Sequence, residues 1–134
     1  SRMRLLLDTD ICIYAINARR PEALARLRDY ALGEVGISAI TYAELRFGVE
    51  NSQRVAENLE RLERFLLPLE IVPFDAKAAQ HYGRIRTELR QRGVPIGAND
   101  LLIAAHALSL EVCLVTNNVR EFERIPELCV ERWG

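Results

Sequence analysis

Lysine and cysteine are both scarce in this chain of 134 residues, in which Lys77 is the single lysine. The cysteines are Cys12, Cys113 and Cys129, an odd number without the CxxC spacing typical of a structural zinc site. This usage predicts a reduced, intracellular and cytoplasmic protein that has no disulfide bond. The cysteines are then expected to serve as small apolar residues of the core.

Long apolar runs, a glycine-rich phosphate loop and a positive net charge are also lacking. No run approaches the roughly 18–20 apolar residues that cross a bilayer, and the apolar stretch after Arg4 is too short for a signal peptide. The missing phosphate loop argues against nucleoside triphosphate hydrolysis. A net charge of −1 gives no overall positive field for a nucleic acid.

Arginine, in contrast, is abundant and unevenly placed. Four arginines crowd one expected helical stretch: Arg84, Arg86, Arg90 and Arg92. Because a guanidinium group binds phosphate through two parallel hydrogen bonds, these side chains are candidates for contact with a nucleic-acid backbone. The alternative is a solvated helix face in an arginine-rich protein.

Short apolar runs alternate with helical periodicity along the whole chain. Strands are expected at residues 4–8, 35–38, 69–73 and 112–116, with a further one at 129–131. Helices are expected at 10–17, from Pro21 to Gly33, at 40–49 and 53–67, between the N-cap Asp75 and Gly93, and at 99–109. This alternation predicts a single α/β domain over residues 1–134, with a mainly parallel sheet of four to five strands.

Acidic residues stand where such a sheet would gather them. Asp8 follows the first strand, and Asp100 opens the apolar helix at 99–109. Glu44 lies in the largely apolar helix at 40–49, where a buried charge needs a partner. Taken singly, Asp8 can be a loop-capping aspartate and Asp100 a carboxylate that complements a helix dipole. Glu44 can be a surface glutamate of an amphipathic helix. Together they fall at one crevice, beyond the carboxyl ends of the strands.

Three carboxylates at one point need a counter-cation, since two unit charges about 4 Å apart repel by roughly 4 kcal/mol at an effective dielectric of 20. Oxygen ligands favour Mg²⁺ or Mn²⁺ over zinc, and His81 and His106 lack a zinc-ligand spacing with these acids. Such a metal orients water, lowers its pKa and stabilises charge on phosphate oxygens. The pattern therefore predicts phosphoryl chemistry.

Four segments in this order resemble the PIN-domain ribonucleases, and more narrowly the VapC toxins: LLLDTDICIYAI, ISAITYAEL, IGANDLLIAAHAL and LVTNNVREFERIPEL. The resemblance implies a three-layer α/β/α fold and Mg²⁺- or Mn²⁺-dependent hydrolysis of RNA. It also implies inhibition by a VapB-type antitoxin and a homodimer, for which the apolar helical surfaces around residues 40–66 are the candidate interface. The third and fourth segments look most like the branch of the family that cleaves initiator tRNA in the anticodon stem-loop.

Carried over position by position, the resemblance makes Asp8, Glu44 and Asp100 the first three acids of the family. Many relatives have aspartate at a fourth position after the last long strand, where this chain has Asn118. Glu121, three residues further, supplies a carboxylate if that segment is helical. Thr116 is the other candidate of this region: it either hydrogen-bonds an acid or the scissile phosphate, or simply ends a strand.

Two other interpretations stay open at this point. The Asp8–Thr9–Asp10 sequence after an apolar strand also fits a haloacid-dehalogenase-like phosphatase. That enzyme needs a well-placed lysine, for which only Lys77 is available, and it leaves Glu44 without a role. The second alternative is a non-catalytic PIN-like module that only binds a partner, which Asn118 in the fourth position would allow.

Overall fold

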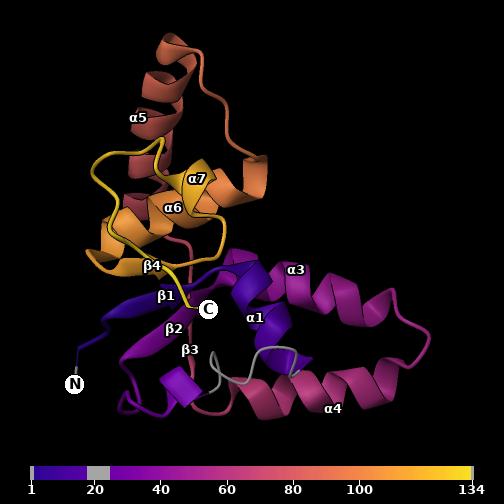
Figure 1. Cartoon of the computed structure of the whole chain (residues 1–134). Coiled ribbons are helices and arrows are strands. Elements are labelled where there is room, and N and C mark those ends of the chain that lie inside the picture. Colours follow the sequence, from indigo (N-terminus) through magenta and orange to yellow (C-terminus); the bar gives the residue numbers. More distant parts are fainter. Residues whose placement is uncertain (1, 18–24, 134) are drawn as a thin grey trace.

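The computed structural model of this chain describes residues 2–17 and 25–133 (Figure 1). The helix expected to open at Pro21 therefore lies partly outside the described residues, and within them residues 25–27 are helical. None of the described helices is long and apolar enough to cross a membrane.

A five-stranded parallel sheet forms the middle of the molecule. Its strands are β1 (Leu5–Leu7), β2 (Val35–Ser38), β3 (Glu70–Val72), β4 (Cys113–Val115) and β5 (Val130–Glu131). They pair in the order β3-β2-β1-β4-β5, and every pair is parallel. The unbroken apolar run of β1 is buried along its whole length because this strand is central and both of its faces are covered. The predicted parallel α/β sheet is confirmed.

Helices cover both faces of this sheet. They are α1 (Thr9–Ile16), α3 (Ala39–Glu50), α4 (Val55–Leu66), α5 (Ala76–Arg92), α6 (Ala98–Leu110) and α7 (Val119–Phe122). Figure 1 shows α5, α6 and α7 on one side of the strands and α1 and α4 on the other. These layers confirm the expected α/β/α architecture.

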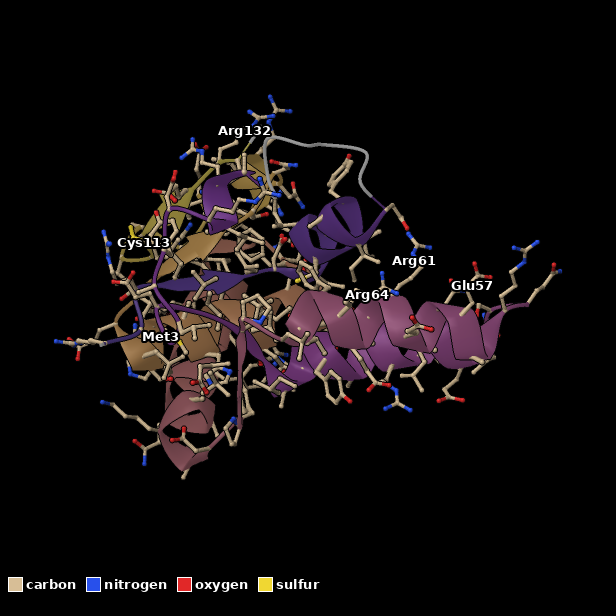
Figure 2. All side chains as sticks on the ribbon, turned by 90° about the horizontal axis from the view of Figure 1, so that it is seen from below. Met3, Glu57, Arg61, Arg64, Cys113 and Arg132 are labelled. Carbon is tan, nitrogen blue, oxygen red and sulfur yellow. A yellow bond between two sulfur atoms is a disulfide. The ribbon has the colours of Figure 1, made fainter. Side chains whose placement is uncertain are left out.

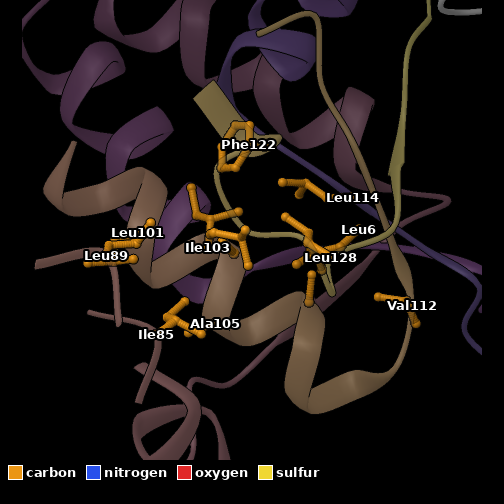
Figure 3. Packing of buried hydrophobic residues seen from close by; sticks show 13 residues of the cluster. Leu6, Ile85, Leu89, Leu101, Ile103, Ala105, Val112, Leu114, Phe122 and Leu128 are labelled. Carbon is orange, nitrogen blue, oxygen red and sulfur yellow. The ribbon is translucent and has the colours of Figure 1, made fainter. Parts of the chain in front are cut away.

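The alternation of side chains along β1 divides the core into two parts. Leu6 points into the cluster beneath α5 and α6, together with Ile103, Leu114 and Phe122 (Figure 3). Leu5 and Leu7 belong to the second cluster, with the buried residues of α1, α3 and α4. This alternation follows from the two-residue period of a strand.

Two predicted helix boundaries are confirmed by their local contacts. The Asp75 carboxylate accepts a hydrogen bond from the Ala78 backbone amide at 2.9 Å, which caps the start of α5. The helix ends at Gly93, whose φ of 68° places it in the left-handed region that favours glycine. The short helix α7 is not among the helices expected from the sequence; a helix around Glu121 is named only as what would let that residue supply a carboxylate.

The prediction that the chain has no disulfide bond is wrong. Cys113, labelled in Figure 2, is bonded to Cys129. Cys12 is free and buried. The physical reason lies in the sheet: β4 and β5 pair Leu114 with Val130, which sets the two preceding cysteines side by side. Their Cα atoms are 4.5 Å apart, within the range that a disulfide spans. A separation of 16 residues gives no such signal in the sequence.

Candidate active site

Asp8 lies at the carboxyl end of β1 and is 2% exposed. Its side chain caps α1 by accepting a hydrogen bond from the Ile11 backbone amide at 2.9 Å. The pKa of this carboxyl is raised to about 6; burial is the largest cause, and the negative charges of Asp10 and Glu44 add to the rise. Hydrogen bonds from the Thr116 side chain and the Ile11 amide oppose the rise in pKa without cancelling it. The surroundings of Asp8 therefore oppose its ordinary ionisation.

Asp100 and Glu121 meet beside Asp8. Asp100 lies in the first turn of α6, and its pKa rises to about 8. Burial is the largest cause, followed by hydrogen bonding with the Glu121 carboxyl and by the charges of Glu121, Asp8 and Asp10. A Cβ placed on Gly97 would lie 3.7 Å from Asp100 Oδ2 and 4.0 Å from Glu121 Oε1, so Gly97 borders both groups. Oε1 of Glu121 is buried, and no donor within the described part of the chain reaches it.

Glu44 approaches the same edge from α3 but is oriented by other partners. Its carboxylate accepts a hydrogen bond from the Thr9 hydroxyl at 2.5 Å and another from the Asn99 side-chain amide at 3.0 Å. Its charge still contributes to the raised pKa of Asp8. Glu44 therefore lies near Asp8 and has hydrogen-bond donors of its own.

Thr116 and Asn118 support this cluster from the end of β4. Thr116 is fully buried, and its side-chain oxygen accepts a hydrogen bond from the Asn118 backbone amide at 2.9 Å. Asn118 precedes α7 and its side-chain amide donates to Glu121 Oε2 at 3.4 Å. Asn118 thus orients Glu121, and Glu121 is the residue of this segment that brings a carboxylate to Asp100.

The candidate acids gather at one edge, as expected, but they do not close around one point. Among residues 2–17 and 25–133, no three histidine, cysteine, aspartate or glutamate side chains converge closely enough to hold a metal ion as they stand. The donor set nevertheless fits Mg²⁺ or Mn²⁺: its ligands are carboxylate oxygens, and one of these is buried without a donor. A cation between them would also relieve the repulsion that raises the pKa values of Asp8 and Asp100.

Three residues of this edge were missed as site residues in the sequence. Asp10 raises the pKa of both Asp8 and Asp100, while Thr9 and Asn99 hold Glu44. An open hollow of about 580 Å³ runs along these side chains, with further lining residues Ile13, Ile40, Ala43 and Phe47. The signal that could have identified them is adjacency, since Thr9 and Asp10 follow Asp8 directly and Asn99 precedes Asp100.

The four arginines of α5 do not join the carboxylates. Arg84 forms ion pairs with Glu88 and Glu127 at 3.3 and 2.9 Å. Arg92 donates to a backbone oxygen, that of Arg124, at 2.8 Å. The other two line a hollow that also includes Pro95, Ile96 and Leu101: they are Arg86 and Arg90. Arg86 also donates to the Tyr82 hydroxyl at 2.8 Å. Contact of these arginines with a nucleic-acid backbone stays a prediction.

Comparison with known proteins shows the family of this chain. Residues 5–128 match the family model of the PIN domain. The chain is 47% identical over 132 residues to ribonuclease VapC2 of Rickettsia felis, covering 98% of each chain. It is 41% identical over 131 residues to the tRNA(fMet)-specific endonuclease VapC of Salmonella typhimurium, again covering 98% of each.

Solved structures show the same fold. VapBC2 from Rickettsia felis, bound to a promoter DNA fragment, contains a chain that superposes with a TM-score of 0.93 at 45% identity, covering 98% of this chain and all of that one. DNA-bound VapBC from Salmonella typhimurium gives a TM-score of 0.94 at 40% identity, with coverage of 98% and 99%. The chain belongs to the PIN-domain family and, within it, to the VapC ribonucleases.

Proposed function

We propose that this protein is the toxin of a VapBC pair, a Mg²⁺- or Mn²⁺-dependent endoribonuclease that cleaves tRNA in the cytoplasm. The observation that carries the proposal is the group formed by Asp8, Asp100 and Glu121. Two of these carboxyls have pKa values raised to about 6 and about 8, and the third has a buried oxygen that no donor among the described residues reaches. Such a group is stabilised by a divalent cation and suits hydrolysis of a phosphodiester.

Each residue has a distinct part in this proposal. Asp8, Asp100 and Glu121 would hold the cation, which when bound lowers the pKa of water and stabilises negative charge on the phosphate. Thr116 and the Ile11 amide fix the orientation of Asp8. Glu44, held by two donors, orients the attacking water and accepts its proton.

A cleavage assay with purified protein tests this assignment. The Asp8→Ala and Asp100→Asn variants are expected to lose RNA cleavage in Mn²⁺ or Mg²⁺, and chelation is expected to abolish it in the wild type. Glu63→Gln is the matched control, because Glu63 is an exposed acid of α4. Full metal-dependent cleavage by Asp8→Ala would refute the assignment. A protein that binds partners without cleaving RNA would instead be the non-catalytic module.

Initiator tRNA, cut in the anticodon stem-loop, is the proposed substrate. Support comes from the Salmonella relative, which is named for tRNA(fMet) and is 41% identical to this chain. End-mapping of cellular RNA after induction tests the substrate against the Asp8→Ala variant. One dominant cut in initiator tRNA supports the proposal, and a dominant cut in another RNA contradicts the substrate while leaving the nuclease intact.

The proposed partner is a VapB-type antitoxin, since the neighbouring structures from Rickettsia felis and Salmonella typhimurium are VapBC complexes. A hollow between α1, α3 and α4 is the proposed binding surface. It is lined by apolar side chains that include Ile13, Leu45 and Leu62, and Glu44 forms part of its wall. An apolar antitoxin segment in this hollow would cover Glu44 and block cleavage. Purification of the two proteins from one operon, followed by a cleavage assay, tests this inhibition.

A homodimer is proposed on the apolar surface of α3 and α4. Phe47 is 69% exposed and Val55 is 37% exposed, and Leu67 just beyond α4 is 80% exposed. Burial of these side chains against a second copy would remove apolar surface from water. Light scattering of the wild type and of Phe47→Glu checks the proposal, with a monomeric variant as the expected result.

A further inference from the structure

The disulfide between Cys113 and Cys129 has no part in the chemistry described above, yet it lies in an accessible place. Cys129 is exposed and Cys113 is half-buried. Both line an open hollow of about 530 Å³, which is also bordered by Met3 and Arg4 at the amino ends of the strands. A small thiol can therefore reach the sulfur–sulfur bond from solvent.

The loop that this bond closes contains one side of the active site. Between the two cysteines lie Thr116, which contacts Asp8, and Glu121, which contacts Asp100, together with Asn118, which contacts both Thr116 and Glu121. Each is placed by a contact within or beside that loop. The Asn118 amide donates to Thr116 at 2.9 Å, and the Asn118 side chain donates to Glu121 at 3.4 Å.

The disulfide also supports a weak strand pair. β5 has two residues and, among the described strands, pairs with β4 alone because it lies at the edge of the sheet. Two backbone hydrogen bonds flank the pair, Leu114 to Cys129 at 2.8 Å and Thr116 to Glu131 at 3.0 Å. Thr116 lies three residues after Cys113, or roughly 10 Å along an extended strand. A displacement of β5 at the disulfide would therefore reach Thr116 through the hydrogen bond from the Thr116 amide to the Glu131 carbonyl.

We propose that Cys113 and Cys129 are a reversible redox site whose disulfide holds residues 114–128, and with them Thr116 and Glu121, in position for catalysis. The proposal rests on the proposed nuclease function for its catalytic consequence. Cys113 and Cys129 act as positioning residues, because neither touches the carboxylates in the described structure.

The redox step is thiol–disulfide exchange with a low-molecular-weight thiol such as glutathione. Two thiol molecules give up two electrons and two protons, the Cys113–Cys129 bond breaks, and the products are two cysteine thiols and one small-molecule disulfide. The reverse reaction, with the small-molecule disulfide as oxidant, restores the bond. Buried Trp133, Leu128 and Phe122 keep the segment folded after reduction, so the expected effect is increased motion rather than unfolding.

Comparison of the oxidised and reduced wild-type chain tests the proposal without a substitution. Thiol titration in denaturant should find Cys12 alone in the oxidised protein and all the cysteines after reduction. Hydrogen exchange followed by mass spectrometry should be faster over residues 117–128 in the reduced protein. Reduction should lower kcat about tenfold while KM changes less than about twofold, because positioning of reacting groups acts on the chemical step.

Two variants serve as controls. The double variant Cys113→Ser/Cys129→Ser should behave like the reduced protein and should not respond to thiols. Cys12→Ala should respond like the wild type, since Cys12 is outside the pair.

Equal exchange and equal kcat in the two redox states would overturn the proposal, as would a thiol response that persists in the double variant. Absence of cleavage in both states, with faster exchange on reduction, would refute the nuclease function and leave the redox site supported.

Discussion

Replacement of Asp8 by asparagine is expected to stabilise the metal-free protein while it abolishes cleavage. The asparagine would retain the side-chain oxygen that accepts the Ile11 amide hydrogen bond, so the cap of α1 would survive. It would lack the negative charge that burial, Asp10 and Glu44 all disfavour. The variant thus separates the structural role of this side chain from its charge.

The magnitude follows from the pKa of Asp8, which is about 6 in the folded protein against 3.8 ordinarily. A pKa raised by folding means that the native state binds a proton more tightly than the unfolded chain. The contribution of Asp8 to the free energy of unfolding is therefore greatest at low pH, and it declines as the pH rises from about 4 to about 6. A pKa difference of about 2 units corresponds to roughly 3 kcal/mol in the free energy of unfolding. The altered contact with Thr116 makes the gain in the variant smaller than this. For a domain of this size, such a gain raises Tm by about 10 °C.

The assay is thermal unfolding of wild type and Asp8→Asn in chelator, at intervals from pH 4 to pH 9. The two melting temperatures should be close at pH 4 and should diverge as Asp8 ionises, up to about pH 6. Because the charge of Asp8 also raises the pKa of Asp100, a smaller further divergence should follow up to about pH 8, above which the difference stays constant. A difference that is independent of pH, or a variant less stable at pH 8 than the wild type, would refute the argument that Asp8 is held against its ionisation.

Three further predictions concern other parts of the molecule. Glu121→Gln should lower the pKa of Asp100 towards its ordinary value, because a neutral amide replaces the charge beside it, and should weaken the protection by Mn²⁺ against thermal unfolding. Arg90→Ala should weaken RNA binding and reduce its salt dependence more than Arg84→Ala, since Arg84 is held in ion pairs; filter binding at several salt concentrations measures both. Leu6→Ala should decrease the free energy of unfolding by about 2–5 kcal/mol, because it leaves a cavity beneath α6 in a fully buried position, as urea titration would show.

Most of the fold could be predicted because it depends on local signals. The buried run Leu5–Leu7, the cap at Asp75 and the left-handed turn at Gly93 each act within a few residues. The bond between Cys113 and Cys129 could not be foreseen, since it depends on which strand pairs with β4 at the edge of the sheet. Cysteine spacing contains no information about strand order.

In the candidate site, too, some features could be predicted from the sequence and others depend on tertiary packing. The position of Asp8 and Asp100 at one edge follows from the parallel sheet, and the structure places them there. The orientation of Glu44 towards Thr9 and Asn99 depends on how α3 packs beside α1 and α6, which is a tertiary feature without a sequence signal.

Hydrogen-bond donors distinguish two kinds of acid at this edge. Glu44 has two donors and needs no cation to satisfy its oxygens. Asp100 and Glu121 face each other instead, and one buried oxygen of Glu121 has no donor in the part of the chain that the structure describes. A divalent ion would therefore stabilise the protein more beside Asp100 and Glu121 than beside Glu44. Beside Asp100 and Glu121 it would replace the repulsion between two carboxylates by their attraction to the cation. In the proposed nuclease, Glu121 rather than Glu44 would complete the cation site, and Glu44 would act on water.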